Sequence, residues 1–166
     1  SRAPALDLSD AAWSAVLVPW ALALPLWGDL HFYVTHRALH SVPSLYSAVH
    51  KLHHRSVNTH VSSSLSMHPL EHVVYFSSLA IGVALPVPLH ALRLLSFGLI
   101  LNPIPSHIAC WPWEHHHWEH HTHFAFNYGS SALFDTVFGT THAAYVARRS
   151  ASGSSGGGGA VARAWD

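Results

Sequence analysis

The chain alternates between apolar stretches and polar, histidine-rich ones. Residues 11–27 contain no charged side chain, and a second long apolar stretch is interrupted by Pro86 and Pro88. Proline interrupts a helix and also restricts the residue that precedes it. The pattern therefore predicts an apolar helix near the start of the chain, followed by a helical hairpin with arms at about residues 70–87 and 89–106.

The length of these arms favours membrane insertion. An α-helix of about 18 residues is about 27 Å long, close to the roughly 30 Å hydrocarbon core of a bilayer. Only 10% of the residues are charged and 49% are hydrophobic, whereas soluble domains usually contain about 25% charged residues. We therefore expect an all-α, integral membrane helical bundle. The alternative is a pair of buried helices in a soluble protein.

A hairpin returns the chain to the side of the membrane that it left. The histidines that precede the hairpin and those that follow it are therefore expected on one face, as a histidine-rich cap. Basic residues, which favour the cytosolic side, accompany them: Arg37, Lys51, Arg55, Arg148 and Arg149. These features predict a cytosolic cap on the membrane-embedded bundle.

The composition sets the remaining limits. The net charge is zero, which gives no support for nucleic-acid binding, since such proteins usually carry a basic patch. Cys110 is the only cysteine, so an intramolecular disulfide and a cysteine-based zinc site are excluded. We expect residues 1–146 to form one membrane-embedded domain and residues 147–166 a disordered Gly/Ser-rich tail. The chain starts without Met, so truncation at the N-terminus is left open.

Histidine is the outlier: the chain has 18, and eight of them form three main clusters. On a helix, positions i, i+3 and i+4 share a face, so each cluster can direct its imidazoles into one space. Together the clusters offer eight ligands, enough for two metal ions with positions left for O2. Imidazole suits Fe, Zn, Cu and Ni. The eight expected ligands, which we also take as the catalytic residues, are His36, His40, His50, His53, His54, His117, His120 and His121.

Other residues are candidates for supporting roles. His68, His72 and His107 are further possible ligands, with helix capping or lining of the site as the alternative for the first two. Five residues are expected to orient imidazoles through their second nitrogen, with capping or turn chemistry as the alternative: Asp29, Glu71, Asn127, Tyr128 and Asp135.

The order of these motifs resembles the fatty acid hydroxylase/sterol desaturase superfamily. The segment His36-Arg37-Ala38-Leu39-His40 resembles its first histidine box, and His50-Lys51-Leu52-His53-His54 its second. His68-Pro69-Leu70-Glu71 is similar to the His-Pro-x-Glu element that often follows. His117-Trp118-Glu119-His120-His121, with Asn127-Tyr128-Gly129 and a downstream Asp135, resembles the third box. The resemblance runs from about residue 29 to residue 140.

The resemblance implies a non-haem di-iron enzyme that uses O2 to hydroxylate or desaturate a lipid C–H bond, in fatty acid, sphingolipid or sterol metabolism. It implies a metal site on the cytosolic side of the endoplasmic reticulum, or a bacterial inner membrane. It also implies electrons from NAD(P)H through a reductase and a cytochrome or ferredoxin; zinc can replace iron in purified material. The lipid would reach the metals through an apolar channel between the hairpin and the first helix.

Two other functions remain open from the sequence. A metal-transport or metal-storage membrane protein would also be rich in histidine, but it would place ligands in the middle of its membrane helices. A catalytically inactive relative would retain the motifs without turnover. The sequence decides neither the lipid, nor the choice between hydroxylation and desaturation, nor the oligomeric state.

Overall fold

The computed structural model describes residues 11–85, 87–101, 106–107 and 115–153, and every regular element in these ranges is helical. The all-α prediction is confirmed. The longer helices are α1 (Ala11–Ser41), α3 (Pro69–Phe76), α5 (Leu89–Leu101), α7 (His115–His123) and α9 (His142–Gly153). The shorter elements are α2 (Pro43–Ala48), η1 (His50–Arg55), η2 (Val61–Leu65), η3 (Ser77–Ala80), α4 (Ile81–Ala84) and α8 (Ala132–Val137).

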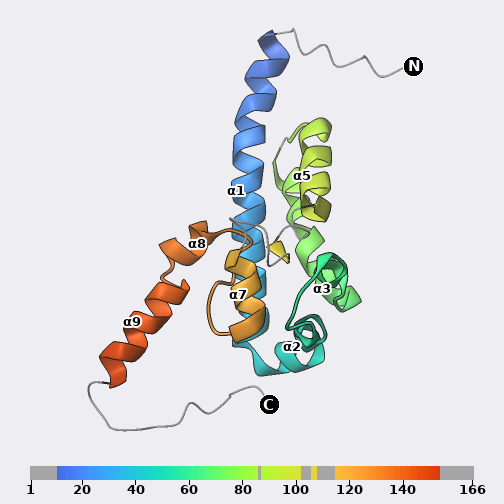
Figure 1. The fold of residues 1–166 in the computed structure, drawn as a ribbon. Coiled ribbons are helices and arrows are strands. Elements are labelled where there is room, and N and C mark those ends of the chain that lie inside the picture. Colours follow the sequence, from blue (N-terminus) through green and yellow to red (C-terminus); the bar gives the residue numbers. More distant parts are fainter. Residues whose placement is uncertain (1–10, 86, 102–105, 108–114, 154–166) are drawn as a thin grey trace.

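Helix α1 is the axis around which the other elements are arranged (Figure 1). It includes the apolar residues 11–27 and continues without interruption through the first histidine box to Ser41, with Pro19 and Pro25 inside it. It ends just before Val42-Pro43, where the proline disfavours helical geometry in the residue before it. The first box is therefore a direct extension of the apolar helix.

The predicted hairpin is present, but its arms are shorter than expected. The first arm is divided into α3, η3 and α4, and the described part of the second arm is the 13-residue helix α5. The break at Ser77 and Ser78 has a local cause, because serine hydroxyls compete for backbone groups and the Ser77 hydroxyl bonds to the Val74 carbonyl. Among the described residues, no helix is both long enough and apolar enough to cross a membrane.

Two small apolar clusters attach the hairpin to α1. Leu24 of α1 packs on Ala91 and Leu95 of α5. The second cluster, nearer the histidines, consists of Leu39, Val49 and Tyr75, with Phe32, Met67 and Val74 packed against it. The Trp27 indole also donates a hydrogen bond to the Ser78 carbonyl at 2.8 Å. Together these contacts fix α3 and α5 along one side of α1.

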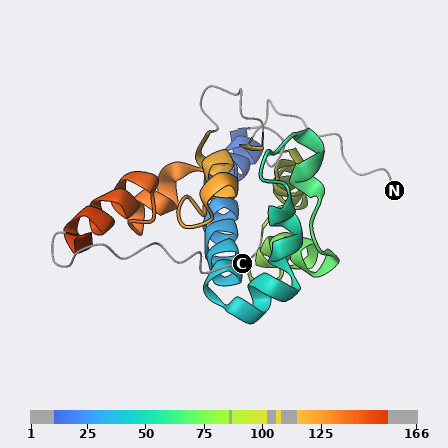
Figure 2. The same ribbon diagram turned by 60° about the horizontal axis from the view of Figure 1, so that its bottom comes forward.

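The end of the described chain differs from the expected tail. Helix α9 continues to Gly153, so the boundary predicted at residue 147 lies inside a helix. Residues 154–166 lie outside the described residues. Helices α8 and α9 extend away from the body formed by α1, α3 and α5, as both views show (Figures 1 and 2).

Candidate metal centre

Nine buried histidines form two adjacent groups where α1, η1 and α7 meet. The five-histidine group consists of His36, His40, His50, His54 and His120. The four-histidine group consists of His53, His107, His117 and His121. Within each group, one nitrogen from every ring lies within 4.8 Å of the others. The groups adjoin, since the ring centroids of His54 and His121 are only 4.6 Å apart.

The second and third boxes each divide between the two groups instead of facing one point. In the third box, His117 and His121 join the four-histidine group, whereas His120 joins the other. On an α-helix, residues four apart differ by about 40° in direction, whereas consecutive residues differ by about 100°. Helix α7 therefore supplies both groups at once. The second box divides in the same way, although it forms the 3-10 helix η1 and not an α-helix.

The distances between ring nitrogens match those around a metal ion. Two imidazole nitrogens bound at about 2.1 Å from one ion lie about 3.0 Å apart at a right angle and about 3.4 Å apart in a tetrahedron. In the five-histidine group, the Nε2 atom of His40 is 2.9 Å from that of His50 and 3.0 Å from that of His54. In the four-histidine group, His107 Nε2 is 3.1 Å from His121 Nε2 and 3.4 Å from His53 Nε2. Both groups therefore have the spacing of a metal site.

The Nδ1 hydrogen bonds of two rings leave their other nitrogens available for a cation. His36 Nδ1 donates to the Tyr128 carbonyl at 2.5 Å, and His50 Nδ1 donates to Glu71 Oε1 at 2.7 Å. These two bonds leave the Nε2 atoms of the two rings facing each other, 3.0 Å apart. In the neutral tautomer each Nε2 carries a lone pair, so an ion between them would satisfy both.

Protonation of the imidazole rings does not readily supply the positive charge between these nitrogens. Burial lowers the pKa of His36, His117 and His120 well below the usual value, and neighbouring imidazoles lower it further. The pKa of His40 falls to about 2 for the same two reasons. These rings are therefore neutral at physiological pH, which is the form that binds a metal.

Several ligand rings are oriented through their second nitrogen by backbone carbonyls. His120 Nδ1 donates to the Phe126 carbonyl at 2.7 Å, and His53 Nδ1 donates to the Ser66 carbonyl at 3.3 Å. Of the five residues expected in this role, only Glu71 is seen, within the described residues, to hydrogen-bond to a candidate ligand ring through its side chain. Tyr128 bonds to His36 through its carbonyl, and its ring packs against the His40 and His120 rings with 5.3 Å between centroids.

Asp135 does not contact the candidate ligand rings directly but holds the loop that carries Tyr128. Its carboxylate accepts from the backbone N–H groups of Tyr128 and Gly129, at 2.9 and 2.6 Å. It also accepts from the Thr140 hydroxyl at 2.6 Å and bonds to His116 Nε2 at 2.8 Å. A Cβ at Gly129 would collide with the Ser131 carbonyl oxygen, so this close approach requires glycine. Asp135 thereby holds the carbonyl that orients His36.

Asn127 and Asp29 stabilise the same region without touching a ligand ring. Asn127, which has a positive φ of 59°, donates through its side-chain amide to Glu119 and accepts from the His142 N–H. The Asp29 carboxylate accepts from the hydroxyls of Ser130 and Ser131 at 2.7 and 2.5 Å. The two residues fasten the loop after α7 to α7, α9 and α1.

Of the three additional histidines, the structure places only His107 among the possible ligands. His107 is 3% exposed and belongs to the four-histidine group. His68 instead caps α3, because its Nδ1 accepts from the Leu70 N–H at 3.1 Å. His72 lies in neither group and lines the adjoining cavity.

Sequence reasoning missed most of the orienting partners. The carbonyls of Ser66 and Phe126 have no signature in the sequence, because every residue has a carbonyl. The Ser106 hydroxyl, 3.1 Å from His107 Nδ1, was also missed, and so was Tyr75. Tyr75 follows Glu71 by four positions, and this helical spacing could have identified it.

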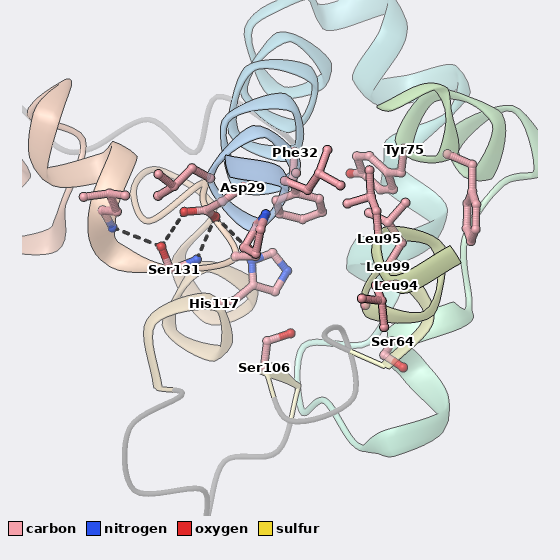
Figure 3. A pocket seen from close by; sticks show the side chains of 18 of the residues that line it. Asp29, Phe32, Ser64, Tyr75, Leu94, Leu95, Leu99, Ser106, His117 and Ser131 are labelled. Atoms are coloured by element: carbon pink, nitrogen blue, oxygen red, sulfur yellow. Dashed lines mark hydrogen bonds between the residues drawn. The ribbon is translucent and has the colours of Figure 1, made fainter. Parts of the chain in front are cut away.

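A cavity of about 660 Å³ leads from the four-histidine group along α1. It lies between α1 and α5, where the channel was expected. Its walls are mostly apolar and include Phe32, Tyr75 and Leu95, and His117 lines it close to Phe32 (Figure 3). His53 and His107 also line it, but no member of the five-histidine group does. An elongated apolar molecule can therefore approach the four-histidine group.

Comparison with known proteins agrees with this combination of helices, histidine groups and apolar cavity. The family described as Fatty acid hydroxylase matches residues 21–140. Fatty acid hydroxylase ahd1 of Mycosarcoma maydis is 33% identical over 75% of the chain and 34% of its own length. A Delta(7)-sterol 5(6)-desaturase of Candida glabrata is 30% identical over 68% of the chain and 33% of its own length. Human cholesterol 25-hydroxylase is 27% identical over 90% of the chain and 61% of its own length.

The chain belongs to the fatty acid hydroxylase family, within the superfamily that also includes the sterol desaturases. It spans about a third of the length of the first two of these curated relatives. No solved structure matches it significantly.

Proposed function

We propose that this chain is the catalytic part of a di-iron enzyme that uses O2 to hydroxylate or desaturate a lipid. The observation that carries the proposal is the pair of adjoining histidine groups, one of which faces a long apolar cavity. The family, whose curated relatives include hydroxylases and desaturases, supports the reaction class. We assign one iron ion to each group, with the nine histidines as ligands.

The iron pair would supply the redox chemistry, because imidazole ligands suit iron and hold it in a site that controls water access. For hydroxylation, one oxygen atom of O2 enters the C–H bond and the other leaves as water, with two electrons and two protons from a reduced carrier. For desaturation, both oxygen atoms leave as water. NAD(P)H, a reductase and a cytochrome or ferredoxin are the donors that we propose.

The chain's own residues position the lipid and the ligands. Phe32, Tyr75 and Leu95 offer the lipid an apolar surface, and burial of that surface favours binding by about 25 cal/mol per Å². The carbonyls and Glu71 fix the ligand rings, so the geometry is set before iron binds. Nine histidines gathered at one buried site also fit an enzyme better than a metal transporter. A transporter would need ligands spread along the route that the ion takes through the protein.

We further propose that the apolar end of the structure lies in a bilayer, with the histidine groups on the cytosolic side. Large apolar side chains are exposed on α1 and α5; among them, Leu22 is 69% exposed, Leu94 64% and Phe97 60%. Exposed apolar surface, where it is large and contiguous, marks a membrane or protein contact, and we propose that these side chains face lipid. The cavity runs beside them, so a membrane lipid could enter directly. The endoplasmic reticulum, or a bacterial inner membrane, is the compartment we propose.

Narrowing the cavity should reduce lipid oxidation without removing iron. Gly98 lines the cavity, and a Cβ added there meets no atom within 4 Å. Gly98→Leu therefore extends a side chain into open space, and it also favours the helix by up to about 1 kcal/mol. We expect a fall of about 10-fold in lipid-dependent O2 consumption with the product detected by mass spectrometry, and an unchanged iron content.

Gly98→Ala is the matched control, since its single methyl leaves most of the cavity open; it should retain nearly full activity. Full activity in Gly98→Leu would exclude this cavity as the lipid site. The absence of any lipid-dependent O2 consumption in the iron-loaded, full-length protein with its electron donors would contradict the proposed function itself.

A further inference from the structure

Tyr75 belongs both to the cavity wall and to a hydrogen-bonded chain that ends at the five-histidine group. Its hydroxyl donates to Glu71 Oε1 at 2.9 Å, and the same oxygen accepts from His50 Nδ1 at 2.7 Å. His50 is a member of the five-histidine group, which the cavity does not reach. Two bonds therefore connect the wall of the cavity with a candidate metal ligand outside it.

Glu71 depends on this tyrosine because it lies deep in the protein. Its side chain is 0% exposed, and among the described residues its Oε2 has no hydrogen-bond partner. A buried carboxylate is costly unless hydrogen bonds replace the water it has lost. Both of its bonds meet at Oε1, from His50 and Tyr75. Without the tyrosine, only His50 would fix the carboxylate.

The position of the Tyr75 hydroxyl is itself set by two elements. Tyr75 and Glu71 lie four residues apart on α3, which places them on the same face of the helix. From α1, the Phe32 ring packs against the Tyr75 ring with 4.8 Å between centroids. Burial first, and Glu71 second, raise the pKa of Tyr75 well above its usual value, so the hydroxyl keeps the proton that it donates.

We infer that Tyr75 is a positioning residue for the metal ion of the five-histidine group, acting through Glu71 on the His50 ring. The inference rests on the proposed function only in requiring that this group binds an ion. Tyr75 also forms part of the cavity wall. It therefore links the cavity to the five-histidine group, which the cavity itself does not contact.

The test is a titration of the metal-free, full-length protein with Co²⁺ in competition with a chelator, followed by the visible absorption of the bound cobalt. Two ions should bind to the unaltered protein. Tyr75→Phe keeps the ring and removes one hydrogen bond, and it should weaken one of the two binding steps by about 3- to 10-fold. Glu71→Gln should weaken the same step by about 10- to 100-fold. The absorption bands of that ion should shift in both variants.

Two further variants separate positioning from a general loss of structure. Phe76→Leu alters the next residue, which also lines the cavity but makes no bond to Glu71; it should leave both binding steps unchanged. The double variant Tyr75→Phe/Glu71→Ala should bind no more weakly than Glu71→Ala alone, because without an acceptor at residue 71 the tyrosine has no bond that leads to His50.

Equal affinities and spectra in Tyr75→Phe and the unaltered protein would overturn the inference, and so would additive losses in the double variant. Neither result would affect the proposed function, which fails only if the unaltered protein does not bind two ions or does not oxidise a lipid.

Discussion

Replacing His120 by alanine should lower the iron content of the protein from about two ions per chain to about one, and lower lipid oxidation at least about a thousandfold, because a single ion cannot replace the pair. His120 is fully buried in the five-histidine group. Its Nε2 is 2.9 Å from His40 Nε2 and 3.3 Å from His54 Nε2. The missing imidazole leaves four ligands around an enlarged space.

The measurement is metal analysis of the iron-loaded protein together with lipid-dependent O2 consumption. His115→Ala is the matched control, because His115 lies on the same helix α7 but is exposed and belongs to neither group; it should keep both ions and full activity. Two tightly bound ions in His120→Ala would show that this histidine is not a ligand.

Asp135→Ala should lower the free energy of unfolding of the metal-free protein by about 3–5 kcal/mol, the range for breaking a buried, hydrogen-bonded charge network. The carboxylate is 0% exposed and satisfies two backbone N–H groups, the Thr140 hydroxyl and the His116 ring. Alanine leaves these groups without their acceptor, and each such loss is costly. Because the loop also carries the carbonyl that orients His36, iron affinity should fall as well.

Urea unfolding in a fixed detergent measures the change. Thr136→Ala is the control, because Thr136 is the neighbouring residue on α8 and is exposed; it should change the free energy by less than about 0.5 kcal/mol. A loss below about 1 kcal/mol in Asp135→Ala would mean that the loop after α7 does not depend on this carboxylate.

The spacing of the histidines predicted a large part of the candidate centre. All eight residues chosen from the three boxes belong to the two groups, because four-residue spacing brings side chains together wherever the local structure is helical. Spacing could separate His120 from His117 and His121 within the third box, but it could not show which histidines of different elements share a group, because that depends on how α1, η1 and α7 meet. The sequence also offered His107, His68 and His72 equally as further possible ligands, although only His107 belongs to one of the two histidine groups.

The limits of the fold prediction have a similar origin. The prolines at 86 and 88 correctly indicated a break between two helical arms, since α4 ends at Ala84 and α5 begins at Leu89. The division of the first arm at Ser77 and Ser78 was not predicted, because a serine in a helical pattern does not show whether its hydroxyl will bond to the backbone, as Ser77 does to the Val74 carbonyl, or whether α1 will bond to the Ser78 carbonyl, as Trp27 does. The partners of the ligand rings were hardest to predict, because carbonyl groups carry no information about residue type.

The most direct test is a diffraction experiment on crystals of the iron-loaded, full-length protein, with anomalous maps calculated at the iron absorption edge. We predict two peaks, one in the five-histidine group and one in the four-histidine group, each about 2.1 Å from imidazole nitrogens. A single peak, or peaks away from these nine histidines, would contradict the two-ion centre.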